Sequence, residues 1–400
     1  MRRVRLWKRA AAYVAVAVII VGAASRLRGA DAKSTPRTQS ASSTTVPPPA
    51  PWQPEVTSVR VRSGYENAER FVSRDIGLSV ALPGRHALWI FGDTGTLARM
   101  PGSRWQPTDF IDGSTAMVVP SARGKVPRGG VELPAGEPSR FVPPPTNVSM
   151  PDGSGRPCAP PTPNAAFAAR WPTGAALMPA DDSQVIVTFV VVCVVKPPTG
   201  APEHHTQGWG YLLYNWRSGH IDRGPVDVLT GPPGGELPVS RRFGWPVFAD
   251  GKLTLFSSNC SSLRVVCSGG NVWSATLAPD VDALDDPASY EPVPVRTDGS
   301  ASWQPLTISV GKYDDGLRLV EQTSILGGYR IFEAPAAGAR WRLAGTGTLP
   351  GCRRITKGFC FGLEGHPELS TATSVFASYK DPNSGPNGHV VVSALRRELR

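Results

Sequence analysis

Two stretches of this sequence follow the same plan and decide the fold. The first reads WPVFADGKLTLFSSN at residues 245–259 and continues as GNVWSATLAP at 270–279. The second reads HPELSTATSVFASYKDP at residues 366–382 and continues as GHVVVSALRR at 388–397. Each contains a short apolar strand, a turn rich in Gly or Asp, a strand that ends in small polar residues, and a last strand with Val, Ala and Leu. This repetition indicates small sheets that recur along the chain.

Pieces of the same plan appear near residues 75–95, 175–216 and 305–335, which gives five groups of strands. Helical periodicity is scarce after residue 55, and 42 Gly and 41 Pro favour turns over helices. Radially repeated four-stranded units form a β-propeller, so the pattern predicts an all-β, five-bladed propeller over residues 57–400. Because the self-similarity is weak, a jelly roll or a β-sandwich is the alternative.

The N-terminus predicts export through a plasma membrane. Five Lys and Arg residues lie among the first nine positions, and Ala10 to Ala24 carries no charge. This layout is typical of a signal peptide or a signal anchor, and we assign residues 1–32 to such an apolar helix. Ala30-Asp31-Ala32 offers a cleavage site, so both retention and cleavage stay open. Residues 33–56 are rich in Ser, Thr and Pro and are predicted to be a disordered linker between membrane and domain.

The charge distribution argues against a nucleic-acid partner. The net charge of +10 includes nine basic residues and one Asp in residues 1–40, so +8 lies there and only +2 on the remaining 360 residues. A nucleic-acid-binding domain would need a basic face of its own. We therefore expect an extracytoplasmic domain, membrane-anchored or secreted, with its basic N-terminus on the cytoplasmic side.

Six cysteines are expected to form disulfides. An exported chain enters an oxidising compartment, and an even number of cysteines allows all of them to pair. The short spacings favour Cys260–Cys267 and Cys352–Cys360, which leaves Cys158–Cys193. Zinc is the rival interpretation, but no C-x-x-C motif and no suitably spaced His supports it. The sequence predicts no metal site and no cofactor.

Two aspartates are predicted to face each other on a hairpin. Apolar residues alternate on both sides of a turn at residues 83–85. If the apolar side chains share one face, Leu78 pairs with Ile90, and the same register pairs Asp75 with Asp93. Directly opposed Cβ atoms are about 4.5–5.5 Å apart. Opposed carboxylates repel each other unless a partner or a function offsets the repulsion.

Paired carboxyl groups are what glycoside hydrolysis requires. One protonates the leaving oxygen and the other acts as base or nucleophile. Proximity raises the pKa of the group that serves as acid. The competing interpretation is structural: each aspartate caps a turn or pairs with Arg74 or Arg99.

Around these aspartates the sequence resembles glycoside hydrolase family 183. The matching residues are 74–77, RDIG, followed by 88–94, LWIFGDT, and later by 366–370, HPELS, with the strand that ends in Ser378-Tyr379. The likeness extends from about residue 60 to the C-terminus. The FGDT motif alone is moderately specific, and its combination with D-I-G and HPELS is more so.

The resemblance implies a five-bladed propeller that hydrolyses D-arabinan of mycobacterial-type cell walls, as an endo-acting and inverting enzyme. It implies that the two first-blade aspartates, here Asp75 and Asp93, are the acid and the base, without saying which is which. The predicted partner is therefore cell-wall arabinan, in arabinogalactan or lipoarabinomannan.

Other residues are candidates for substrate binding. His366 and Glu368 lie in a matching motif, and Asp112, in Ile-Asp-Gly-Ser, is a candidate to line the same pocket as the aspartates. Aromatic residues near predicted blade edges are candidates for stacking on sugar rings: Trp171, Trp245, Trp303 and Tyr379. Each has a structural alternative, as a turn-stabilising or packing residue. The Pro-rich segment from Val119 to Pro163 is predicted to be an insertion that shapes the groove or to be disordered.

Two further functions stay open. A propeller fold hosts many activities, so a non-catalytic protein that binds wall glycan or a partner protein is the main alternative. A glycosidase with another furanoside or pyranoside specificity is the third hypothesis.

Overall fold

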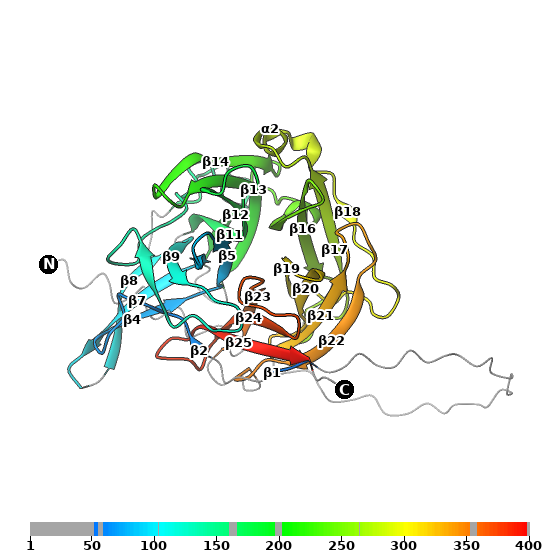
Figure 1. Ribbon diagram of the computed structural model, residues 1–400. Helices are drawn as coiled ribbons and strands as arrows, with labels where there is room; N and C mark the ends of the chain where they lie inside the picture. The colour runs from blue at the N-terminus through cyan, green and yellow to red at the C-terminus, as the bar shows by residue number, and fades with distance from the viewer. Residues whose placement is uncertain are drawn as a thin grey trace, which may run out of the picture.

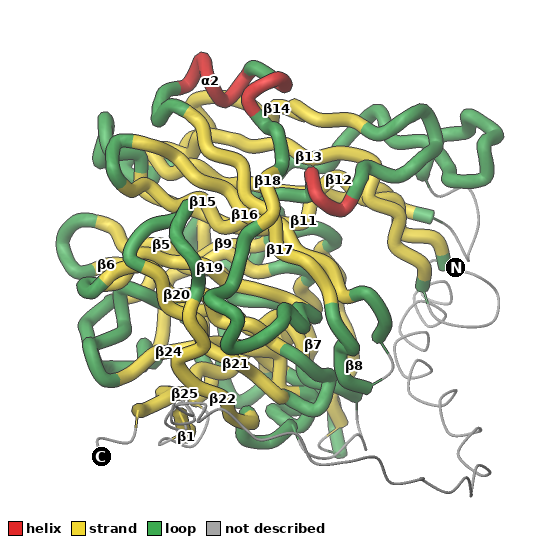
Figure 2. Tube along the Cα trace, turned by 90° about the vertical axis from the view of Figure 1, so that its right-hand side faces the viewer, coloured by secondary structure: helices red, strands yellow, loops and turns green. Residues whose placement is uncertain are grey.

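The computed structural model describes residues 52–54, 59–102, 104–159, 166–196, 202–263, 265–352 and 358–397. Nearly all regular structure in these residues is β-strand, and the strands form a β-propeller (Figure 1). This confirms the predicted fold class. Figure 2 shows that the short helix α2 (Val281–Asp285) lies at the periphery, outside the sheets.

The described residues form five sheets of four or five strands, which we call blades one to five in chain order. Blade one contains β5 (Leu78–Leu82), β6 (His86–Phe91), β9 (Thr115–Pro120), β10 (Gly129–Leu133) and β3 (Arg62–Ser63). Blade two contains β11 (Phe167–Leu177), β12 (Gln184–Val195), β13 (Glu203–Asn215) and β14 (His220–Thr230). Blade three contains β15 (Gly244–Ala249), β16 (Lys252–Cys260), β17 (Gly270–Leu277) and β18 (Val293–Pro294).

Blade four contains β19 (Thr307–Tyr313), β20 (Gly316–Gln322), β21 (Gly328–Ala334) and β22 (Arg342–Thr348). Blade five contains β23 (Phe361–Gly365), β24 (Ser374–Asp381), β25 (His389–Arg397) and β1 (Trp52–Pro54), with β2 (Val59–Arg60) also paired to β25. A separate three-stranded sheet contains β4 (Arg70–Arg74), β7 (Thr94–Met100) and β8 (Arg104–Ile111). One strand from each blade contacts the corresponding strand of the next blade. From blade one to blade five these strands are β5, β11, β15, β19 and β23.

The two ends of the described chain close the ring together. β25 pairs antiparallel with β1, where Arg397 lies opposite Trp52, and with β2, where Val392 lies opposite Val59. β1 falls within the segment 33–56 that the sequence assigned to the linker, so the sheet includes residues 52–54 of that segment. The predicted signal segment 1–32 lies outside the described residues. Among the residues that are described, no helix is long and apolar enough to cross a membrane.

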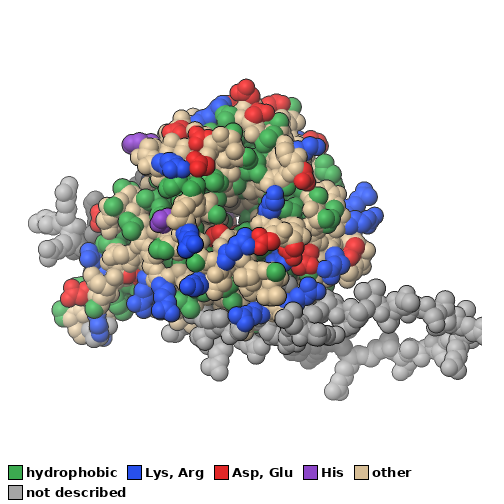
Figure 3. Space-filling view, viewed as in Figure 1, with side chains coloured by type: hydrophobic (Ala, Val, Ile, Leu, Met, Phe, Trp, Pro, Cys, Tyr) green, Lys and Arg blue, Asp and Glu red, His purple; other side chains and the backbone are tan. Residues whose placement is uncertain are grey.

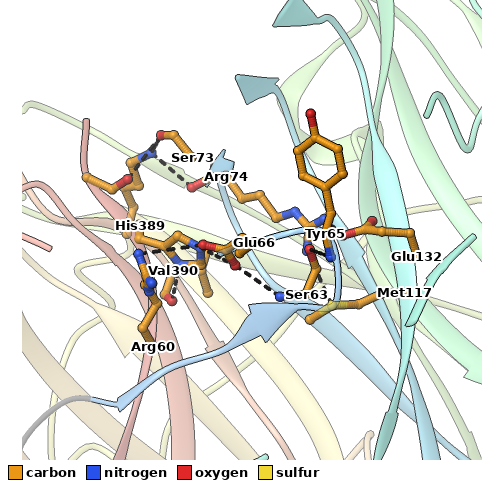
Figure 4. Close-up of polar contacts among 12 residues, drawn as sticks. Arg60, Ser63, Tyr65, Glu66, Ser73, Arg74, Met117, Glu132, His389 and Val390 are labelled. Carbon is orange, nitrogen blue, oxygen red and sulfur yellow. Dashed lines mark hydrogen bonds and ion pairs between the residues drawn. The ribbon is translucent and has the colours of Figure 1, made fainter. Parts of the chain in front are cut away.

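Buried ionisable side chains lie at this closure (Figure 4). Glu66 lies 3.6 Å from Arg60 and 3.9 Å from His389 of β25, and its Oε2 accepts the backbone N–H of Ser63 at 3.0 Å. Burial raises the pKa of Glu66 and lowers that of His389, which favours the neutral form of each side chain. The network ties the first strands of the chain to the last.

The cores lie between neighbouring blades, which explains the long apolar runs. In β12, Val187 and Phe189 pack toward blade one, whereas Ile186 packs toward blade three. Both faces of such a strand are covered, so the run from Val185 to Val195 shows no polar alternation.

All three predicted disulfides form: Cys158–Cys193, Cys260–Cys267 and Cys352–Cys360. The first ties the segment after blade one to β12 of blade two. The prediction for Val119 to Pro163 needs a correction, because its first part contains the strand β10, which pairs with β9. The later, irregular part buries Phe141, Val142 and Val148 in the core beside blade two.

Candidate active site

The predicted register of the hairpin is confirmed. Leu78 pairs with Ile90, and the same register continues on the other side of the two aspartates, where Arg74 pairs with Thr94. The backbone N–H of Asp75 donates to the carbonyl of Asp93 at 3.0 Å. The two aspartates therefore lie opposite each other where the chain passes between blade one and the three-stranded sheet.

The backbone makes a sharp local turn at this junction. Ile76 has a φ of 53°, an unusual value for a β-branched residue. On the opposite segment, Gly92 donates its N–H to the carbonyl of Asp75 at 2.6 Å, and a Cβ at Gly92 would lie 3.2 Å from that oxygen. Such strained backbone persists where the surroundings enforce it, and it concentrates at functional sites.

The Asp93 carboxyl is held by neutral donors. Its Oδ1 accepts the backbone N–H of Gly113 at 2.8 Å and the indole N–H of Trp171 at 3.0 Å. Burial raises the pKa of Asp93 to about 7, and the negative charge of Asp75 adds to the shift. At neutral pH a large share of Asp93 is therefore protonated and able to donate a proton.

Asp75 has a different partner. Lys380 Nζ of β24 lies 2.8 Å from Asp75 Oδ1, and the Asp75 side chain is 34% exposed. The same ammonium donates to Ser73 Oγ at 3.0 Å and to the carbonyl of Arg74 at 2.9 Å. Three contacts thus fix a buried cation beside one aspartate of the pair.

Arg74 does not neutralise either aspartate. Its guanidinium forms a buried ion pair with Glu132 of β10 (Figure 4). It also lies over the ring of Phe91, 4.2 Å from the centroid. The structural alternative in which Arg74 pairs with the aspartates is therefore not what the structure contains.

One face of blade five points toward this junction. Ser378 and Lys380 lie two residues apart on β24 and so share a face, and Ser378 Oγ donates to the carbonyl of Gly77 at 2.9 Å. Glu364 of β23 pairs directly with Ser378 and therefore lies on the same face. Its Oε2 accepts the indole N–H of Trp245 at 2.9 Å. Figure 3 shows the hollow at the centre of the face that Figure 1 presents.

The structure brings some of the predicted residues together. Trp171 donates directly to Asp93. Asp112 lies next to this contact, because it directly precedes Gly113, whose N–H Asp93 accepts, and it forms an ion pair with Arg140. Trp245 reaches the face of blade five that contacts Asp75.

The other predicted binding residues lie in the interior. His366 is fully buried, stacks on Trp89 with ring centroids 4.4 Å apart, and has its Nδ1 2.5 Å from Ser79 Oγ. Ser79 also donates to Glu368 Oε1 at 2.6 Å, so this motif fastens blade five to blade one. Burial lowers the pKa of His366 to about 3 and raises that of Glu368 to about 7.

Two of the predicted aromatic residues are also core residues. The indole N–H of Trp303 donates to the carbonyl of Val295 at 2.9 Å, and Tyr379 donates its hydroxyl to the carbonyl of Pro350 at 3.0 Å. Both side chains are buried, and their polar atoms are satisfied by backbone. In this position neither can stack on a sugar, which corrects their proposed role.

Sequence reasoning missed Lys380 and Glu364. Lys380 directly follows the Ser378-Tyr379 strand end, and Glu364 lies two positions before the HPELS motif. Both therefore adjoin motifs that had already been singled out, and that proximity was the available signal.

No protein-family model matches the chain, and no curated protein does. Among solved structures the chain is similar to a Bacteroides ovatus protein, with 13% identity and a TM-score of 0.48 over 88% of this chain and 97% of that one. It is similar to Zg3597, a family 117 glycoside hydrolase of Zobellia galactanivorans, with 10% identity and a TM-score of 0.41 over 85% and 89%. It is also similar to the GH43_1 enzyme of Xanthomonas citri complexed with xylotriose, with 10% identity and a TM-score of 0.39 over 87% and 89%. These values are too low to assign this chain a family or an activity.

Proposed function

We propose that this protein is a cell-envelope glycoside hydrolase, an inverting endo-D-arabinanase that acts on the arabinan of arabinogalactan or lipoarabinomannan. The observation that carries the proposal is the unequal environment of two opposed carboxyl groups. Asp93 is held by neutral donors and has a pKa of about 7, whereas Asp75 has an ammonium partner at 2.8 Å. Two carboxyl groups whose surroundings differ in this way are suited to the roles of acid and base.

In the proposed reaction Asp93 is the general acid. It donates its proton to the glycosidic oxygen as the bond from that oxygen to the anomeric carbon breaks. Asp75 is the general base, which takes a proton from a water molecule as that water attacks the opposite side of the anomeric carbon. The product is a hemiacetal of inverted configuration, and proton exchange with solvent returns both carboxyl groups to their starting states.

The extracytoplasmic location is part of the proposal. It is supported by the pairing of the described cysteines, since stable disulfides belong to oxidising compartments. The choice of arabinan comes from the family resemblance around residues 74–94 and 366–370.

The test is incubation of the purified full chain with arabinogalactan, followed by analysis of released oligoarabinosides and of their initial anomeric configuration by NMR. Wild type should release oligosaccharides with inverted anomers, and Asp75→Asn and Asp93→Asn should each release them at least about 100-fold more slowly. Retained hydrolysis in both variants would refute the assignment. Glycan binding without product release, unchanged by both substitutions, would instead identify a non-catalytic propeller.

A further inference from the structure

Glu364 is a buried carboxyl group that the proposed reaction does not use. Its residue is 5% exposed, and it lies on the face of blade five whose neighbours Ser378 and Lys380 contact Gly77 and Asp75. The backbone of the same strand also touches this segment, because a Cβ at Gly362 would lie 2.9 Å from Ile76 Cγ1. Glu364 therefore lies on the blade-five side of the candidate site, and the hairpin beside Asp75 and Asp93 lies on the blade-one side.

The partner of Glu364 comes from a blade that is not its neighbour. Trp245 lies on β15 of blade three, yet its indole nitrogen lies 2.9 Å from Oε2 of Glu364 in blade five. Ser309 of blade four, between them, accepts the backbone N–H of Gly365 at 2.9 Å. The Trp245 side chain packs against the core between blades three and four and thus extends past blade four to reach the carboxyl group.

The backbone is built to place Trp245 there. Trp245 has a φ of 49°, a left-handed conformation that is uncommon for a non-glycine residue. A Cβ at Gly174 of blade two would lie 2.2 Å from the backbone nitrogen of Trp245, so only glycine permits this approach. Strain of this kind persists only where other contacts hold the residue in place.

The chemistry of Glu364 suits a fixed hydrogen-bonding role. Burial raises its pKa to about 8, and hydrogen bonds from Trp245 and Ser309 offset this only in part. A neutral carboxyl group has one oxygen that accepts the indole N–H and an O–H that donates. Glutamine offers the same pattern with its amide group.

We propose that Glu364 is a positioning residue that holds the Trp245 indole between blade three and blade five, so that the ring face forms a stacking platform for the sugar unit bound beside Asp75 and Asp93. Trp245 is half-buried, so part of the residue remains accessible. The apolar face of a furanose ring stacks on such a surface. The inference rests on the proposed function, because it supplies the binding half of the same site.

The test compares Glu364→Gln with Glu364→Ala in hydrolysis of arabinogalactan. Glu364→Gln keeps an acceptor for the indole, so its kcat/KM should stay within about threefold of wild type, with the same pH profile. Glu364→Ala and Trp245→Ala should each raise KM about tenfold with a smaller loss in kcat. The double variant should be no worse than Trp245→Ala, because Glu364 acts through Trp245. If Glu364→Ala does not fold, Trp245→Phe removes the same hydrogen bond from the other side and should raise KM, with its Tm lowered only by the loss of one buried hydrogen bond.

Two results would overturn the proposal. If Glu364→Gln loses activity as completely as Asp93→Asn, then Glu364 itself transfers a proton; if the Glu364→Ala and Trp245→Ala effects add, the two act independently. Calorimetric binding of an arabino-oligosaccharide to Asp93→Asn separates this proposal from the function. If Glu364→Ala, added to Asp93→Asn, weakens oligosaccharide binding, the result supports the stacking platform even if the wild-type protein hydrolyses nothing. If Asp93→Asn does not bind the oligosaccharide, or binds it equally well with Glu364→Ala added, the stacking platform is refuted.

Discussion

The propeller contains two similar indole–carboxyl pairs, Trp171 with Asp93 and Trp245 with Glu364. The indole N–H donates to the carboxyl oxygen at 3.0 Å in the first pair and 2.9 Å in the second, and burial raises the pKa of both carboxyl groups. They differ in what faces them. A second carboxyl group, Asp75, lies opposite Asp93, whereas Ser378 lies opposite Glu364. Only the first pair therefore has the second carboxyl group that the proposed reaction requires.

The largest expected effect is the contrast between two isosteric substitutions. Asp93→Asn removes the proposed proton donor and should lower kcat/KM by a factor of about 10²–10⁴. Glu364→Gln removes a carboxyl group that also accepts an indole N–H and should change kcat/KM by less than about threefold. Initial rates on arabinogalactan at one pH measure both. Equal losses in the two variants would break the distinction between the pairs.

The pH profile of wild type tests the same contrast without mutation. A general acid must be protonated in the free enzyme, and the pKa of Asp93 is about 7. The logarithm of kcat/KM should therefore fall with a slope of −1 above this pH, which amounts to about 100-fold by two pH units higher. A profile that stays flat from pH 6 to 9 would rule out Asp93 as the acid.

Lys380 should have a smaller effect, because it acts on Asp75 rather than on substrate. Lys380→Met removes the ammonium that contacts Asp75, Ser73 and Arg74, and kcat should fall roughly tenfold. Lys380→Arg should restore part of the activity.

The control for this prediction is Lys252→Met, an exposed lysine at the start of β16. It removes the same charge from the protein but not from the site, so its rates and pH profile should equal those of wild type. If Lys380→Met keeps the wild-type kcat, Lys380 only supports the fold.

Local patterning explains why the hairpin could be predicted. The alternation of Leu78, Val80, Leu88 and Ile90 fixes which side chains face the core, and a one-residue slip would bury the wrong set. The register of Asp75 and Asp93 follows from that constraint alone. Cysteine spacing predicted the disulfides in the same local way.

Contacts between blades could not be predicted in this way. Trp245 meets Glu364 across 119 positions of sequence, and Lys380 meets Ser73 across 307. No periodicity within a strand encodes such contacts, because they depend on how the ring closes. For the same reason Trp303 and Tyr379 were assigned to the site although they lie in the core: an aromatic residue near a turn looks the same in sequence in either place.

The smallest expected effect concerns stability and completes the contrast between Asp93 and its neighbours. The pKa of Asp93 rises from 3.8 to about 7 on folding, so folding favours its protonated form. Its contribution to stability is fully present below pH 3.8 and is lost as pH rises toward 7. Asp93→Asn keeps the acceptor for Gly113 and Trp171 but never ionises, so its Tm should exceed that of wild type at pH 8 by at least about 2 °C and should match it near pH 4. Differential scanning calorimetry at both pH values measures this. A variant that is less stable than wild type at pH 8 would mean that the ionised carboxylate stabilises the fold. That result would contradict the raised pKa on which the proposed role of Asp93 as the acid depends.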